Sequence, residues 1–144
     1  MSKRTYIDAN LLIAAFRGEG ELGRRAIEIL DDPDRALVAS DAIRLEVMPK
    51  PLYEKRQHEI DFYDTVLDWA EHLKWSTDTL YRAYDLAEKH GIAAMDAIHV
   101  ATALDASVDE FVTAEKPTKP MFRVTALRMQ SIRTIFPLSQ GTPS

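Results

Sequence analysis

Short apolar segments that lead through a polar residue into a helix place the strongest constraint on how this chain folds. Residues 6–7 lead through Asp8 into the apolar run 11–16, and residues 36–39 lead through Ser40 into a second helical segment. A strand that turns directly into a helix is the unit of parallel sheets that are covered by helices on both faces. The sequence therefore predicts an α/β fold with a mostly parallel central sheet.

The same alternation continues along the chain up to residue 136. Periodic apolar residues predict helices, and short apolar runs bounded by turn residues predict strands. We expect helices over 22–30, from 41 to Pro49, over 53–73, from a cap at Thr77 to a left-handed cap at Gly91, and over 95–104, with strands over 111–113 and 131–136. Residues 1–136 then form one domain, and residues 137–144 form a loose tail that has little to bury.

Composition excludes several classes of site. The chain has 144 residues and no cysteine, so we expect one core, and disulfides, thiolate catalysis and Cys-bound metal centres are excluded. No apolar run approaches the length of a membrane span, which favours a soluble protein of the cytoplasm without membrane contact. The net charge of −5 provides no basic footprint for nucleic acid. If four carboxylates bind metal ions, however, the rest of the chain is close to neutral, and a nucleic-acid substrate is permitted.

Three acidic residues follow predicted strands or lie on the apolar side of a helix. Asp8 and Glu115 each follow a strand, at the edge where open parallel sheets bind ligands. Glu46 lies among apolar residues on one side of its helix. Each has an ordinary alternative explanation. Asp8 could cap a helix, Glu115 could be solvated at the surface, and Glu46 could pair with Arg44 or Lys50.

Asp96 is the most informative acid, because residues 93–104 form a helix with almost no polar face. A buried carboxylate must be paired, hydrogen-bonded or bound to a cation. The alternative is that Asp96 only stabilises the start of this helix, where the helix dipole favours a negative charge. His99, one turn further on, could donate to a carboxylate or to a backbone oxygen, and it is assigned at most a supporting role.

Four segments resemble, in this order along the chain, the motifs of PIN-domain nucleases. They are residues 6–13, 40–47, 96–103 and 111–115, and the most specific is the run Asp96-Ala97-Ile98-His99. The resemblance spans nearly the whole chain. Prokaryotic PIN domains of this size are mostly VapC-type toxins of toxin–antitoxin pairs.

This resemblance implies a three-layer α/β/α sandwich, dependence on Mg²⁺ or Mn²⁺, cleavage of RNA phosphodiester bonds, a cognate antitoxin protein and a homodimer. By position, Asp8, Glu46 and Asp96 match the metal-binding acids of the family, and Asn10 and Thr113 match polar residues that support the site. The family usually has aspartate at the place of Glu115. This departure leaves open whether Glu115 is a ligand and whether one or two metal ions bind.

The expected chemistry is metal-assisted hydrolysis, in which no protein general base is required. Asp8 and Asp96 are expected to bind the principal ion, Glu46 to bind it or orient a water, and Glu115 to serve a second ion or an outer water. Basic residues near these acids are candidates for binding RNA phosphates, although solvated surface charge explains each of them equally well. They are Lys50, Lys55, Arg56, Lys116, Lys119 and Arg123.

Two competing interpretations differ in what the acids do. A phosphatase of the dehalogenase type requires a second aspartate two residues after Asp8, and this position is Asn10. A PIN-like module that binds RNA or a protein without cleaving remains open, because the metal site could be weakened at Glu115. The apolar sides of the predicted 53–73 helix could contact a partner or pack on the core.

Overall fold

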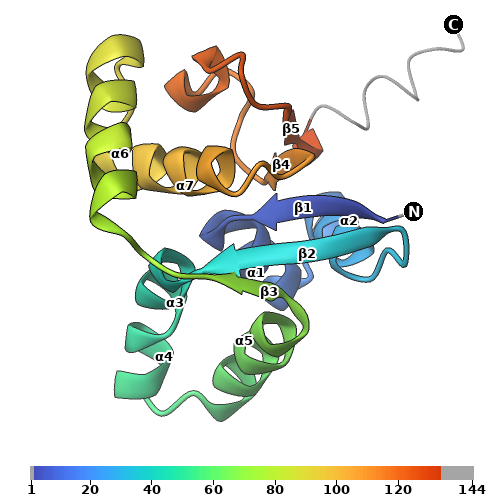
Figure 1. Ribbon diagram of the computed structural model, residues 1–144. Helices are drawn as coiled ribbons and strands as arrows, with labels where there is room; N and C mark the ends of the chain where they lie inside the picture. The colour runs from blue at the N-terminus through green and yellow to red at the C-terminus, as the bar shows by residue number, and fades with distance from the viewer. Residues whose placement is uncertain (1, 134–144) are drawn as a thin grey trace, which may run out of the picture.

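The computed structural model of the protein describes residues 2–133, and a five-stranded parallel sheet in the order β3-β2-β1-β4-β5 runs through its centre (Figure 1). The strands are β1 Lys3–Ile7, β2 Arg35–Ser40, β3 Glu71–Leu73, β4 Glu110–Thr113 and β5 Met129–Ser131. The helices are α1 Ala9–Arg17, α2 Gly20–Leu30, α3 Asp41–Val47, α4 Pro49–Tyr53, α5 Gln57–Trp69, α6 Thr77–His90, α7 Ala94–Asp105 and the 3₁₀ helix η1 Pro120–Arg123.

Helices cover the sheet on both faces, which confirms the predicted three-layer α/β/α arrangement. Helix α1 packs against α2, α3 and α5 on one side, whereas α6, α7 and η1 pack against one another on the other side. In Figure 1 the second group lies above the sheet. Because β4 returns across β1 from the far edge at β3, the order of strands reverses next to β1. Open sheets bind their ligands at such a reversal, at the carboxyl ends of the strands.

The predicted helix over 53–73 is wrong at both ends. Helix α5 covers only Gln57–Trp69, and Ala70 adopts an extended backbone that leads directly into β3. Strand β3 pairs with β2, with His72 opposite Ala39, but its side chains are largely exposed. An exposed edge strand of three residues has no alternation of apolar and polar residues that would identify it. The helical periodicity of α5 was therefore extended over these residues in the prediction.

Three smaller boundaries also differ from the prediction. Pro49 begins the separate short helix α4, since proline suits the first turn of a helix as well as it ends one. Ser76, and not Thr77, caps α6 by accepting from the backbone N–H of Thr79. Strand β5 ends at Ser131, where the predicted strand over 131–136 was to begin. The predicted tail over 137–144 lies outside the described residues.

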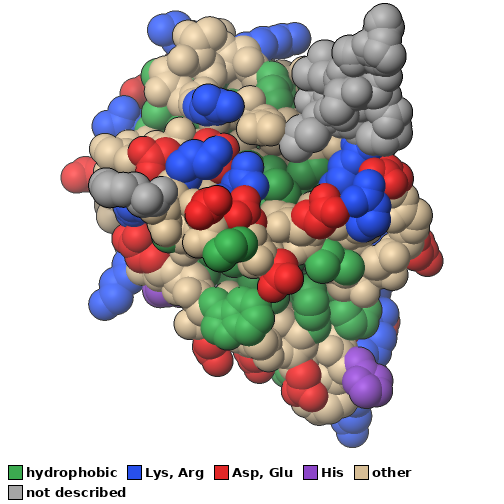
Figure 2. All heavy atoms as spheres, turned by 90° about the vertical axis from the view of Figure 1, so that its right-hand side faces the viewer, with side chains coloured by type: hydrophobic (Ala, Val, Ile, Leu, Met, Phe, Trp, Pro, Cys, Tyr) green, Lys and Arg blue, Asp and Glu red, His purple; other side chains and the backbone are tan. Residues whose placement is uncertain are grey.

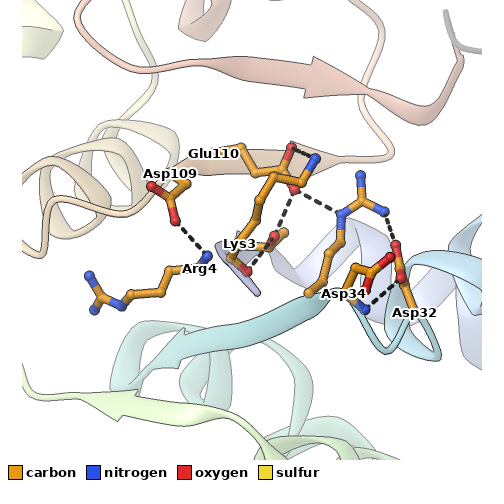
Figure 3. A network of polar contacts seen from close by, with 8 residues as sticks. Lys3, Arg4, Asp32, Asp34, Asp109 and Glu110 are labelled. Atoms are coloured by element: carbon orange, nitrogen blue, oxygen red, sulfur yellow. Dashed lines mark hydrogen bonds and ion pairs between the residues drawn. The ribbon is translucent and has the colours of Figure 1, made fainter. Parts of the chain in front are cut away.

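A network of paired charges closes the sheet at the amino ends of its strands (Figure 3). Glu110 of β4 is fully buried, and its carboxylate accepts from Thr5 Oγ1 at 2.7 Å and from Arg35 Nε at 2.8 Å. The Lys3 ammonium lies 3.7 Å from the same carboxylate. Burial acts to raise the pKa of Glu110, but the bonds from Thr5 and Arg35 outweigh it, so this pKa is lowered. Strands β1, β2 and β4 are thus joined by charge at this end.

The described part of the chain contains no helix that is both long enough and apolar enough to span a membrane.

Candidate metal-binding active site

Asp8 and Thr113 lie side by side at the carboxyl ends of the neighbouring strands β1 and β4. Ile7 pairs with Val112 in the parallel register, so the next residue of each strand reaches the same edge of the sheet. Thr113 Oγ1 donates to one carboxylate oxygen of Asp8 at 2.6 Å, and the backbone N–H of Leu11 donates to the other at 3.0 Å. Asp8 therefore caps α1, and it also stands at the carboxyl edge of the sheet.

Burial makes the Asp8 carboxylate costly to ionise. The side chain is 3% exposed, and burial raises its pKa to about 6 although the bonds from Thr113 and Leu11 act to lower it. The nearby charge of Glu115 raises the pKa of Asp8 further, and that of His99 lowers it. A carboxylate in this state is stabilised by any cation that binds beside it.

Asn10 and Glu115 meet across the same edge. The Asn10 amide donates to the Glu115 carboxylate, and the backbone N–H of Glu115 donates to Thr113 Oγ1 at 3.0 Å. Ser131 Oγ of β5 donates to the backbone oxygen of Glu115 at 2.5 Å. The loop after β4 is therefore anchored, and the longer side chain of Glu115 is turned toward Asn10.

Glu46 pairs with His99 and not with a basic residue of its own helix. His99 Nε2 of α7 lies 2.5 Å from Glu46 Oε1 of α3, whereas Arg44 pairs with Asp64 at 3.3 Å. This geometry removes Arg44 as the explanation for the position of Glu46. The Glu46 side chain remains 31% exposed, so it faces solvent on its other side.

A buried tyrosine continues this chain of hydrogen bonds into the core. Tyr6 Oη lies 2.7 Å from His99 Nδ1 and 2.7 Å from Ser40 Oγ, and Tyr6 is fully buried. Sequence reasoning missed Tyr6 and Ser40 as supports of the site. The available signal was a tyrosine in a buried strand, because a buried hydroxyl must find a partner.

Asp96 stands in the first turn of α7 without capping it. The helix begins after Ala93 and has no side-chain cap, and the Lys119 ammonium lies 3.9 Å from the Asp96 carboxylate. Burial raises the pKa of Asp96, Lys119 lowers it, and the charges of Glu115 and Glu46 raise it. Glu115 is therefore within electrostatic range of both Asp8 and Asp96, and Glu46 is within range of Asp96, although these residues are far apart in the sequence.

This group of side chains suits a hard divalent cation in donor type and in charge. Carboxylate oxygens with amide and hydroxyl neighbours are the ligands that Mg²⁺ and Mn²⁺ take. The pKa values of Asp8 and Asp96 are raised mainly by burial and to a smaller extent by neighbouring acids, and a bound cation would favour the ionised form of both. Within residues 2–133, however, no three His, Cys, Asp or Glu side chains are grouped closely enough to hold one ion as they stand.

The predicted phosphate-binding residues are dispersed. Lys50 and Arg56 line the same hollow as Glu46, and Lys119 lies beside Asp96. Arg123 donates to the backbone oxygen of His90 at 2.7 Å and is engaged there. In the described part of the chain, no hydrogen bond or ion pair links Lys55 or Lys116 to the four acids. A residue that the sequence did not suggest, Arg17 at the end of α1, borders the hollows on both sides of the acids.

Comparison with known proteins identifies one family. The family model described as PIN domain matches residues 5–116. This range includes all four acidic residues. Among curated proteins, none matches this chain.

Solved structures of bacterial toxin–antitoxin systems share the fold. A chain from VapBC2 of Rickettsia felis, bound to a DNA fragment from their promoter, has 16% identity and a TM-score of 0.69 over 89% of this chain and 98% of that chain. A toxin–antitoxin complex from Klebsiella pneumoniae has 24% identity and a TM-score of 0.68 over 85% of this chain and 94% of that one. VapC20 from Mycobacterium tuberculosis, a toxin that cleaves the sarcin-ricin loop, has 10% identity and a TM-score of 0.57 over 74% of this chain and 86% of that one.

Proposed function

The chain belongs to the PIN-domain family, and on that basis we propose that it is a metal-dependent endoribonuclease, the toxin of a toxin–antitoxin pair, acting in the cytoplasm. The observation that supports this proposal most directly is that Glu115, at the carboxyl edge of the sheet, is within electrostatic range of both Asp8 and Asp96, whose pKa values are raised. A structural cluster of acids would be paired with basic residues, as Glu110 is at the opposite edge. Among the described residues, only Lys119 and His99 lie within ion-pair distance of any of the four acids.

Bound Mg²⁺ or Mn²⁺ would neutralise charge on the phosphate and activate a water for attack. Asp8 and Asp96 would hold the principal ion, because their ionised forms gain most from a nearby cation. Thr113 and the backbone N–H of Leu11 each donate to one oxygen of Asp8, so the orientation of this carboxylate is fixed before an ion binds. Asn10 binds Glu115 and His99 binds Glu46, which fixes the positions of these two acids. Either acid would then bind the ion directly or orient a water beside it.

Two apolar hollows fit the two protein partners that we propose. One lies between α2 and α5, has a volume of about 470 Å³ and includes Ile27, Phe62 and Trp69. In Figure 2, hydrophobic side chains gather on the lower half of this side of the molecule, where Figure 1 places α2 and α5. Its border at His58 is shared with the hollow beside Glu46, so an antitoxin segment seated here could continue toward the acids.

The second hollow lies between α6 and α7 and has a volume of about 600 Å³. Leu80, Tyr81 and Tyr84 on its border are 45%, 67% and 71% exposed, which is unusual for large apolar side chains. We assign this surface to a second copy of the chain. The resulting homodimer leaves the α2–α5 hollow of each copy free for an antitoxin.

Substitution of Asp96 by asparagine tests the proposed activity. With Mn²⁺ and a mixed RNA substrate, the wild-type protein should cleave, and Asp96→Asn should lower the rate at least about 100-fold while remaining folded by circular dichroism. Asp78 also stands in the first turn of a helix but is exposed, so Asp78→Asn is the matched control and should cleave normally. A folded wild-type protein that binds RNA and cleaves none would instead establish the non-catalytic module.

A further inference from the structure

A hollow of about 610 Å³ opens beside Glu46, between α1, α3, α4 and α5. Arg17, Lys50, Arg56 and His58 contribute basic groups to its lining, and Phe16 gives it an apolar surface. A groove that joins positive charge with aromatic surface is suited to a single nucleic-acid strand, whose phosphates and bases need these two kinds of contact. The groove ends at one of the four acids, so its contents would lie next to the proposed site.

The basic groups of this groove are not equivalent. Arg56 is engaged by Glu54 at 3.0 Å and by Glu59 at 3.1 Å. Neither Arg17 nor Lys50 has a side-chain hydrogen bond or an ion pair with any residue from 2 to 133, and both are exposed. Arg17 stands in the last turn of α1, and Lys50 lies on the five-residue helix α4. Two free cations therefore face the groove.

Arg17 also borders a second, smaller hollow. This hollow has a volume of about 220 Å³ and is lined by Asn10, Glu115 and Arg133 among others. One hollow thus touches the acidic site at Glu46 and the other touches it at Glu115, with Arg17 and Ile13 common to both. A strand whose reacting phosphate lies at the acids would extend into the two hollows in opposite directions and pass Arg17 between them.

Resting on the proposed function, we propose that Arg17 and Lys50 bind the phosphates of single-stranded RNA that flank the cleaved bond, with Lys50 in the larger hollow and Arg17 between the two. Phe16 would contact a base in the larger hollow. The positive charge of these two residues offsets the repulsion that the acids exert on a phosphate strand.

The test measures binding of a fluorescent single-stranded RNA by anisotropy, in EDTA so that cleavage does not occur, over a series of salt concentrations. Loss of one phosphate contact should reduce the slope of log affinity against log salt by about 0.7, which corresponds to about fivefold weaker binding at about 0.1 M salt. Arg17→Gln and Lys50→Gln should each show this loss, and Arg17→Lys should restore most of it. Lys89→Gln, at an exposed position on α6 away from both hollows, carries the same charge change and should bind as the wild type does.

The same variants, assayed for cleavage with Mn²⁺, separate the two proposals. Cleavage by the wild type together with unchanged salt slopes for Arg17→Gln and Lys50→Gln would overturn this inference alone. A wild type that neither cleaves nor binds RNA would overturn both. If Arg17→Gln and Lys50→Gln bind RNA normally but lose an acidic peptide from a partner protein, the groove is a protein site and the inference also fails.

Discussion

His99 Nε2 of α7 lies 2.5 Å from Glu46 Oε1 of α3, and His99 Nδ1 lies 2.7 Å from Tyr6 Oη of β1. A carboxylate can only accept hydrogen bonds, so in the neutral imidazole Nε2 carries the hydrogen and Nδ1 accepts from Tyr6. Tyr6 Oη is then left to accept from Ser40 Oγ. Each hydroxyl or ring N–H therefore donates toward the site, from Ser40 through Tyr6 and His99 to Glu46.

Replacing Tyr6 by phenylalanine should break this chain of hydrogen bonds. His99 Nδ1 and Ser40 Oγ would lose their partner in the core, and we expect a loss of about 1–3 kcal/mol in the free energy of unfolding. In ¹⁵N spectra of the imidazoles, wild-type His99 should be the tautomer protonated at Nε2. Tyr6→Phe should keep this tautomer, because Glu46 still accepts from Nε2, but the Nδ1 signal should shift because it loses the bond from Tyr6. Tyr63→Phe also removes a buried tyrosine hydroxyl bond, to Glu59, and should leave the His99 signals unchanged. A wild-type His99 protonated only at Nδ1 would contradict the assignment.

The raised pKa of Asp8 predicts how the stability of the metal-free protein depends on pH. Its folded pKa is about 6 and its ordinary value is 3.8, so between these values the folded chain holds a proton that the unfolded chain has lost. The free energy of unfolding should therefore fall by about 3 kcal/mol as pH rises through this window. Urea unfolding in EDTA at a series of pH values measures it. Asp8→Asn should lack this fall and Asp78→Asn should keep it, whereas equal pH profiles for wild type and Asp8→Asn would contradict the prediction.

Divalent metal should reverse this destabilisation. An ion that binds only the folded chain at a hundredfold excess over its dissociation constant adds about 2.7 kcal/mol, or roughly 8 °C in melting temperature for a domain of this size. Thermal melts with millimolar Mg²⁺ or Mn²⁺ at neutral pH should show this rise for the wild type and for Asp78→Asn, but not for Asp96→Asn. The rise should shrink below about pH 6, where Asp8 is protonated. Identical melts with and without metal would count against the site.

Glu110 predicts the opposite pH dependence at the other end of the sheet. Its folded pKa is lowered, so it stabilises the fold above its ordinary value of 4.5, and this contribution is lost as pH falls through the folded pKa. Glu110→Gln leaves Arg35 and Lys3 without this buried counter-charge and should lower the free energy of unfolding by at least about 2 kcal/mol at neutral pH. Its unfolding should also depend less on pH in acid than that of the wild type. Cleavage per folded molecule should be unchanged, and a specific loss of cleavage would refute the separation of the two edges.

The two apolar hollows predict different effects on assembly. A charge at Tyr84 would be buried against a second copy, so Tyr84→Lys should convert a dimer to a monomer in light scattering after size exclusion. Trp69 is 66% exposed beside the α2–α5 hollow, and Trp69→Lys should leave the dimer intact while weakening antitoxin binding. A wild-type monomer at micromolar concentration, or a Tyr84→Lys dimer, would contradict the assignment to a second copy.

The sequence predicted those parts of the fold and of the candidate site that depend on local pattern. Asp8 and Thr113 each end an apolar strand, and two parallel strands that end at one edge bring such residues together. Strand β3 could not be predicted, because Glu71–Leu73 is exposed and becomes a strand only by pairing with β2. The strand forms because of its tertiary contact with β2, and the local propensity of its residues does not predict that contact.

The partners of the site residues were also beyond local pattern. Glu46 and His99 are 53 residues apart, and nothing in the sequence around either one selects the other. Surface cations were the least predictable, since a solvated side chain leaves no periodic signal. Lys55 was therefore proposed for phosphate binding, whereas Arg17, which borders both hollows, was not.

The opposed edges of the sheet have a consequence for how this protein can evolve. Neutral substitution of Asp8 or Asp96 removes charge that the metal-free fold tolerates poorly, whereas substitution of Glu110 breaks a network that the fold requires. Random mutation under selection for folding alone would therefore erode the acids first and retain the charge network. A lineage released from selection for cleavage would drift toward a sturdier, inactive scaffold, so conservation of all four acids among descendants would itself record continued use of the activity.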